Sequence, residues 1–216
     1  MKAKDFLSRS NKKKKLSPAL TDSKKQNKLA ALQGDYGFLD IKDMPTSKYK
    51  YNTIQLTNHN WATTGEFSDI ASNHCGAIAS TNLALYFAYQ GYDNLLKDDN
   101  KEKTFLEIHK LIGNGPVMKI AKKTQDYFKS RGYDLGYSRA NSYKGIKNAV
   151  EKNRPCCVLL SAAILDWHWI VAIGWREYSD GDKYLQIING WNNSTQKFLK
   201  LKSGSKLVSA TEYWIR

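Results

Sequence analysis

The sequence predicts an α+β fold, in which helices come first along the chain and a mostly antiparallel sheet follows. Two observations predict it. Between Cys75 and Val150 apolar residues recur three or four positions apart, which is helical spacing. After Pro155 the pattern changes to apolar runs of strand length and to alternation. Because the two kinds of element are segregated along the chain, we expect a helical half packed on a sheet.

The expected helices have recognisable start and stop signals. The first begins at Cys75, capped by Ser72 or Asn73, and ends at Gly91. Three more are expected: one carrying Phe105 to Ile112 and ending at Gly113, one from Pro116 to Gly132, and one from Ser142 to before Pro155. The expected strands are 51–57, 133–137, 156–161, 167–175, 184–188, 196–201 and 207–215.

Charge divides the chain into two parts. Residues 1–50 hold 13 Lys and Arg against 5 Asp, out of a net charge of +14 for all 216 residues. Residues 1–34 are Lys-rich and nearly free of aromatic residues, which predicts a flexible basic arm or a propeptide-like segment. We favour a solvated tail for this arm, with contact to an anionic polymer or membrane surface as the alternative. Residues 35–216 form the predicted folded domain.

Several classes of protein are excluded or disfavoured. No run of about 18 apolar residues is present, so we expect no membrane span. No apolar segment follows Met1, so the chain as written reads as cytoplasmic, or as secreted if its N-terminus has been trimmed. The three cysteines fit neither a disulfide framework nor a zinc site. We therefore expect no metal and no cofactor, and a monomer.

Cys75 is the first candidate for chemistry. It stands in the first turn of a predicted helix, where the helix dipole favours an anion. Such a position lowers the pKa of a thiol from ~8.5 toward ~3.5–7.5, which would store a nucleophilic thiolate. The alternative is a cysteine that only packs in the core. Cys156 and Cys157, inside an apolar strand, are interpreted in this second way.

A histidine and an asparagine downstream favour the catalytic interpretation. His168 opens an apolar strand, and Asn189 closes the next one, so antiparallel pairing would bring them together. An imidazole can take the thiol proton and return it to a leaving amine, while a third polar group orients the ring. Asp166, on the same face of the strand as His168, is an alternative orienting group. His74 faces away from Cys75 and is expected to serve a loop or cap.

These residues resemble the papain-like cysteine peptidases. The resemblance rests on Cys75-Gly76-Ala77-Ile78-Ala79, on His168-Trp169 opening a Val/Ile strand, and on Asn189-Gly190-Trp191. The chain is most similar to the bacterial branch of double-glycine leader peptidases. The resemblance covers about residues 35–216. It implies Cys75 as nucleophile, His168 as general base and acid, and Asn189 as the orienting group.

One position departs from the family pattern. The resemblance implies a glutamine six residues before the cysteine, whose amide helps to bind the oxyanion, but Asp69 stands there. A carboxylate would oppose a developing negative charge. The backbone N–H of Cys75 can supply one donor, and Asn73 or Gln55 is a candidate for the second. Trp191 is expected to support the site by shielding its hydrogen bonds from water.

The prediction is therefore a thiol hydrolase that cleaves peptide or isopeptide bonds in a peptide or protein substrate. The same three residues would also serve a peptidoglycan amidase or an acyl transferase. A further alternative is a catalytically idle module of papain-like fold that binds an anionic partner through its basic arm.

Overall fold

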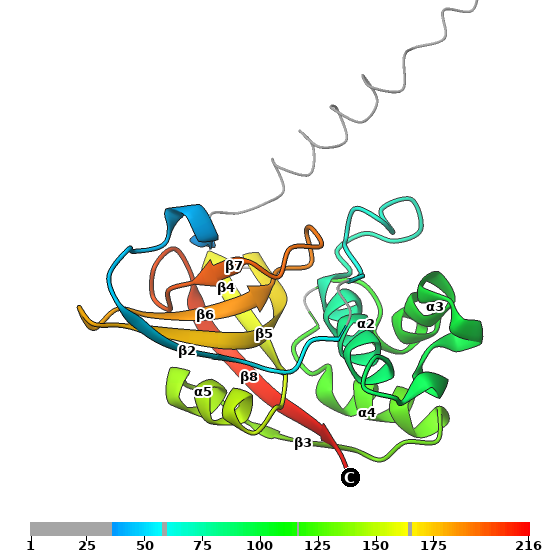
Figure 1. The fold of residues 1–216 in the computed structure, drawn as a ribbon. Helices are drawn as coiled ribbons and strands as arrows, with labels where there is room; N and C mark the ends of the chain where they lie inside the picture. The colour runs from blue at the N-terminus through cyan, green and yellow to red at the C-terminus, as the bar shows by residue number, and fades with distance from the viewer. Residues whose placement is uncertain (1–35, 58–59, 116, 164–165) are drawn as a thin grey trace, which may run out of the picture. The chain divides into compact units, whose positions relative to one another are not determined.

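The described part of the chain is an antiparallel sheet with a group of helices beside it (Figure 1). The computed structural model describes residues 36–57, 60–115, 117–163 and 166–216, all within the unit Gly34–Arg216. The helices are α2 (Cys75–Ala88), α3 (Lys101–Ile112), α4 (Ala121–Ser130) and α5 (Tyr143–Glu151). The short 3₁₀ turns are η1 (Ile41–Asp43), η2 (Asp93–Leu95) and η3 (Lys97–Asp99). The strands are β1 (Phe38–Asp40), β2 (Tyr49–Thr53), β3 (Leu135–Arg139), β4 (Cys156–Ala163), β5 (Asp166–Tyr178), β6 (Lys183–Ile188), β7 (Lys197–Leu199) and β8 (Lys206–Ile215).

The sheet is built around β5. Its strand order is β1-β7-β6-β5-β4-β8-β3, with β2 also paired to β5, and every pair is antiparallel. One edge of β5 pairs with β4 and then with β2, while the other edge pairs with β6. Val171 lies opposite Ile188, the last residue of β6. Continuing this register brings the segment after β6, which begins with Asn189, back to His168.

Helix α2 is the centre of the helical group. Every residue from Gly76 to Ala88 is buried, so the helix is covered on all sides, as its run of apolar and small residues predicts. It packs against β5 on one side and α3 on another, and α3 in turn packs on α4 (Figure 1). Helix α5 lies apart from this group, against β2, β4, β5 and β8. No helix in the described ranges is long and apolar enough to cross a membrane.

Most of the predicted elements within these ranges are confirmed, and the deviations have physical causes. Ser142 caps α5 as predicted, with its hydroxyl accepting the N–H of Gly145 at 3.0 Å. Helix α4 begins at Ala121, later than expected, and Pro116 lies outside the described residues. The predicted strand 196–201 is only Lys197–Leu199, because Lys200 to Ser203 form a turn. Residues 1–34 also lie outside the described ranges, so the arm and its boundary stay predictions.

The predicted cap of α2 is incorrect. The cap residue is His74 and no side chain bonds there, whereas Ser72 or Asn73 was expected. The backbone of Asn73 has φ 51°, and its carbonyl accepts the N–H of Gly115 at 2.8 Å. The chain therefore turns one residue later than the cap rule predicts, because Asn73 binds the loop after α3 instead.

Replacing Gly37 by alanine is expected to destabilise the fold. Gly37 has φ 73°, and a Cβ there would lie 2.1 Å from the carbonyl oxygen of Ser203. We expect Gly37→Ala to lower the free energy of unfolding by about 3 kcal/mol or more, measured by urea denaturation. Gly91→Ala is the matched control, since Gly91 has φ 98° and open space around it, and should cost only about 1–2 kcal/mol. Equal losses in the two variants would contradict the steric argument.

Candidate functional site

Cys75 lies at the exposed start of the buried helix α2. Its side chain is partly exposed, and the amides of the first helical turn have no acceptor within the helix. The backbone N–H groups of Gly76 and of Cys75 itself point toward the sulfur, and so does the N–H of Trp169 on β5. The thiol therefore lies against the main chain of the residue that follows His168.

His168 lies near the start of β5, with 5% of its surface exposed. Its Nε2 is 2.7 Å from the main-chain carbonyl oxygen of Asn189. A carbonyl can only accept a hydrogen bond, so Nε2 carries the proton and Nδ1 keeps its lone pair. An imidazole in this tautomer can accept a proton at Nδ1.

Asn189 contacts His168, but through a different group from the one predicted. The main-chain carbonyl of Asn189 accepts the hydrogen bond from the ring, rather than the side-chain amide. The side-chain oxygen of Asn189 instead accepts the N–H of Trp191 at 3.0 Å. That bond closes a tight turn in which Gly190 has φ 73°. The amide thus shapes the turn, and the turn presents the carbonyl to His168.

Aromatic rings enclose the imidazole. Trp191 stacks on His168 with ring centroids 4.5 Å apart, as the predicted supporting role of this residue requires. Tyr36 and Phe38 also contact the ring, at 5.4 Å and 6.2 Å between centroids. The sequence analysis assigned no role at the site to Tyr36 or Phe38. No local spacing links them to His168, because they are about 130 residues apart in the chain.

Asp166 acts on His168 through its charge rather than through a hydrogen bond. Its carboxylate accepts the hydroxyl of Tyr36 at 2.6 Å, while the ring of His168 bonds to Asn189. The Asp166 charge still favours the protonated imidazole. The alternative in which Asp166 orients the ring therefore has no supporting hydrogen bond among the described residues.

Burial makes the neutral forms of Cys75 and His168 the stable ones. Desolvation lowers the pKa of His168 to about 4, although the Asn189 carbonyl and Asp166 oppose the shift. Burial also raises the pKa of the Cys75 thiol, and the three backbone N–H groups around the sulfur oppose this only in part. The predicted lowering of the thiol pKa by the helix start is therefore wrong, because desolvation outweighs the helix amides.

The predicted oxyanion donors lie in different places. The carbonyl of Gln55 accepts the side-chain N–H of Gln90, which follows the C-terminal end of α2. Fourteen helical residues span about 21 Å, so Gln55 is at the opposite end of α2 from Cys75. Asn73 does lie beside the site, two residues before Cys75, and is exposed. Asp69 is exposed in the turn before α2.

The remaining histidines have structural surroundings. His74 is 4% exposed and its ring contacts Phe105, which agrees with its expected loop or cap position. Burial lowers the pKa of its ring, although the carbonyls of Thr64 and Ala71 lie beside the ring and oppose the shift. His109 bonds to Asn114 at 2.7 Å on the surface. His59 lies outside the described residues.

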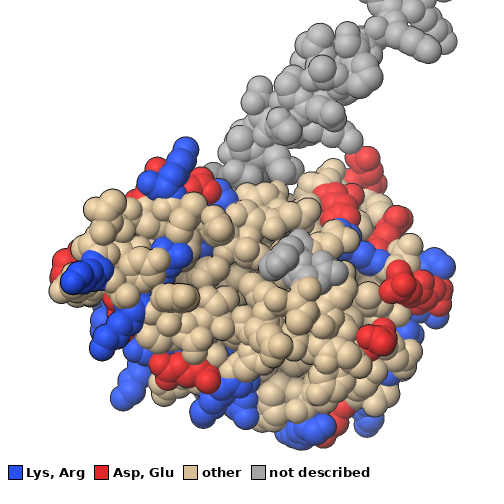
Figure 2. Space-filling view, in the orientation of Figure 1, with Lys and Arg blue, Asp and Glu red and all other residues tan. Residues whose placement is uncertain are grey.

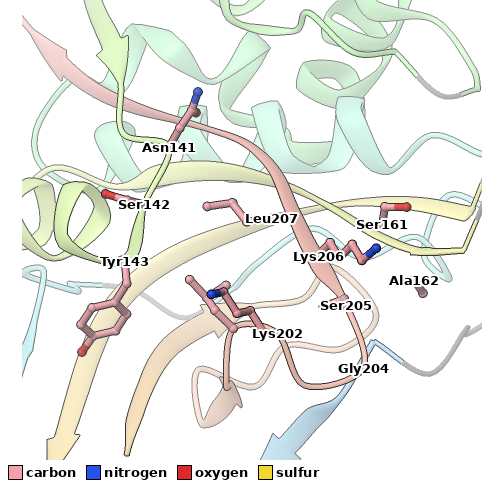
Figure 3. A pocket seen from close by; sticks show the side chains of 11 residues that line it. Asn141, Ser142, Tyr143, Ser161, Ala162, Lys202, Gly204, Ser205, Lys206 and Leu207 are labelled. Atoms are coloured by element: carbon pink, nitrogen blue, oxygen red, sulfur yellow. The ribbon is translucent and has the colours of Figure 1, made fainter.

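The other cysteines and possible metal ligands add no second site. Cys156 and Cys157 are buried in β4, as predicted for core thiols. In the described ranges, no three His, Cys, Asp or Glu side chains lie close enough to hold a metal ion. A cavity of about 760 Å³ lies elsewhere, between the start of α5 and the start of β8 (Figure 3). Tyr143, Ser161, Lys202 and Leu207 line it, and none of the candidate site residues does.

Solved structures share this fold at low sequence identity. A candidate C39-like peptidase from Bacillus anthracis is 10% identical, with a TM-score of 0.50, over 76% of this chain and 98% of that one. The bromelain protease from Ananas comosus, in complex with the E64 inhibitor, is 16% identical with a TM-score of 0.34. That alignment covers 83% of this chain and 99% of bromelain, but its TM-score is too low to carry an argument.

The C39-like structure confirms the predicted fold class. The chain has the α+β fold of the papain-like cysteine peptidases, of the kind seen in the C39-like structure. No protein-family model matches the sequence, and no curated protein matches it either. At 10% identity the likeness is one of fold, so the roles of individual residues rest on the geometry above.

The raised thiol pKa leads to a testable pH dependence. Because Cys75 is a neutral thiol at pH 7, its alkylation by iodoacetamide should rise about tenfold per pH unit between pH 7 and 9. Mass spectrometry of the modified peptide gives the rate at each pH. Cys156 and Cys157, which are buried, should stay unmodified over the same time and serve as internal controls. An alkylation rate that does not change with pH below pH 7 would mean that Cys75 is already a thiolate there. That result would contradict the assignment of a neutral thiol.

Proposed function

We propose that this chain is a cysteine-type peptidase that hydrolyses peptide or isopeptide bonds through a thioester on Cys75. The observation that carries the proposal is the position of the Cys75 sulfur, against the main-chain N–H that follows His168. The fold shared with a C39-like structure is consistent with this chemistry. The middle of the face shown in Figure 2 carries few charged side chains.

The first half of the reaction forms the thioester. As the sulfur attacks the substrate carbonyl, Nδ1 of His168 takes the thiol proton, because Nε2 already holds a proton in its bond to Asn189. The carbonyl oxygen becomes an oxyanion. When the intermediate collapses, the C–N bond breaks and Nδ1–H protonates the departing amine. The products of this half are a free amine and an acyl group on Cys75.

The second half releases the acid. Nδ1 of His168 takes a proton from water as the water oxygen attacks the thioester carbon. The C–S bond breaks, and the proton on Nδ1 returns to the sulfur. The net change is one water added across one amide bond. Since both groups start neutral, the proton transfers from the thiol and from water accompany bond formation at carbon instead of preceding it.

Loss of the nucleophile is the direct test. Cys75→Ala should lower the hydrolysis of unfolded casein by at least about 10³-fold, because no other described thiol reaches the site. Ser72→Ala, at an exposed position three residues earlier, is the matched control and should keep full activity. Equal turnover by the wild type and Cys75→Ala would overturn the proposal. If the protein solubilises purified cell wall but leaves casein intact in a separate assay, the amidase alternative is favoured instead.

Asn189 provides a second test, which separates its carbonyl from its side chain. Asn189→Ala keeps the main-chain carbonyl that holds His168 and loses only the bond to Trp191. One neutral hydrogen bond contributes about 0.5–1.5 kcal/mol, so kcat/KM should fall by no more than about tenfold. His168→Ala, which removes the base, should cost about 10²–10⁴-fold. Similar losses in both variants, in a steady-state assay with one fluorogenic peptide, would show that the side-chain amide is essential.

A further inference from the structure

The proposed reaction needs a second donor for the oxyanion, and the described structure narrows the choice. The N–H of Cys75, at the start of α2, supplies one donor. A second donor must lie in the same cleft, near both the start of α2 and the segment that holds His168. Gln55 lies at the far end of α2, and Asp69 carries the wrong charge. The candidates that remain are Asn73 and the loop that contains Thr64.

Thr64 meets both positional conditions. Its backbone N–H donates to the carbonyl of Gly190 at 2.7 Å, and Gly190 directly follows Asn189. Its own carbonyl lies beside the ring of His74, which directly precedes Cys75. Thr64 therefore contacts the residue before the proposed nucleophile and the turn that holds the proposed base.

The loop around Thr64 is held firmly by side chains from α2 and α3. The buried amide of Asn82 bonds to both the N–H and the carbonyl of Ala62, at 2.7 Å and 3.1 Å. Lys101 forms an ion pair with Glu66 at 2.7 Å. Contacts on both sides of Thr64 thus fix its backbone before substrate arrives, which is what an efficient oxyanion donor requires.

The hydroxyl of Thr64 is available, in contrast to that of its neighbour. Thr63 uses its hydroxyl to accept the N–H of Glu66 at 3.3 Å. Thr64 is partly exposed, and its hydroxyl makes no hydrogen bond with any residue that the structure describes. A hydroxyl is a neutral donor that can rotate toward a developing negative charge.

We infer that the hydroxyl of Thr64 is the second oxyanion donor, acting together with the N–H of Cys75. This inference rests on the proposed peptidase function and adds a catalytic residue to it. The hydroxyl donates a hydrogen bond to the oxyanion while keeping its proton, so the atom balance of the reaction is unchanged. Asn73 is the competing donor, but its main chain is bonded to Gly115 rather than to the Asn189 segment.

The test compares variants that differ only in the donor. Thr64→Val keeps the branched shape and the backbone bond to Gly190 but removes the hydroxyl. We expect its kcat to fall about 10²-fold with KM little changed, because the lost bond forms only in the transition state. Thr64→Ser should keep kcat within about threefold of the wild type. Thr63→Val is the matched control and should keep near-wild-type kcat, whereas Asn73→Ala tests the competing donor.

A peptide aldehyde provides a second readout that does not depend on turnover. The aldehyde adds reversibly to Cys75 and forms a tetrahedral adduct with an oxygen in the same position. Its inhibition constant should rise in Thr64→Val by about the factor lost in kcat, while alkylation of Cys75 by iodoacetamide should not change. Unfolding midpoints equal to that of the wild type exclude a folding defect.

The outcomes separate this inference from the proposed function. If the wild type is active and the kcat of Thr64→Val lies within twofold of it, the Thr64 assignment alone is overturned. The same holds if the loss of kcat occurs in Asn73→Ala instead of Thr64→Val. The wild type could instead hydrolyse no peptide but bind the aldehyde at Cys75 more tightly than Thr64→Val does. That result would overturn the peptidase function and support the donor assignment.

Discussion

The contact between the start of α2 and β5 is the constraint on which the site depends. Helix α2 is buried on every side, so its axis has no freedom to shift against the sheet. The start of α2 approaches β5 closely, since a Cβ on Gly76 would touch the Trp169 side chain at 3.4 Å and would crowd Ile120 at 3.2 Å. This approach positions the Cys75 sulfur against the main chain beside His168.

The same burial has an electrostatic consequence. Removing water from the junction disfavours both the thiolate and the imidazolium, so the resting pair is neutral. A neutral pair has no stored charge to drive the attack. In the proposed reaction, the oxyanion of the transition state would be the main charge at the site, so preorganised donors would matter more than the helix dipole.

Residues from the beginning of the described chain complete the surroundings of the base. The segment around β1 carries Tyr36 and Phe38 to the ring of His168, where Trp191 covers another side. Tyr36 also holds the Asp166 carboxylate, whose charge partly offsets the effect of burial on the imidazole. The ring is thus fixed by one hydrogen bond and by packing on several faces, which limits it to a single useful orientation.

Local sequence patterns identified the fold class and most of the helices and strands, because periodicity and capping depend on near neighbours. They also identified Cys75, His168 and Asn189 as the candidate site residues. Three properties depended on distant contacts and were inaccessible to such patterns. The sign of the Cys75 pKa shift follows from how deeply α2 is buried. The group of Asn189 that holds His168 follows from the register of β5 with β6 and from the turn at Gly190. The positions of Tyr36 and Thr64 follow from segments that meet only in the folded chain, where packing rather than sequence spacing selects the neighbours.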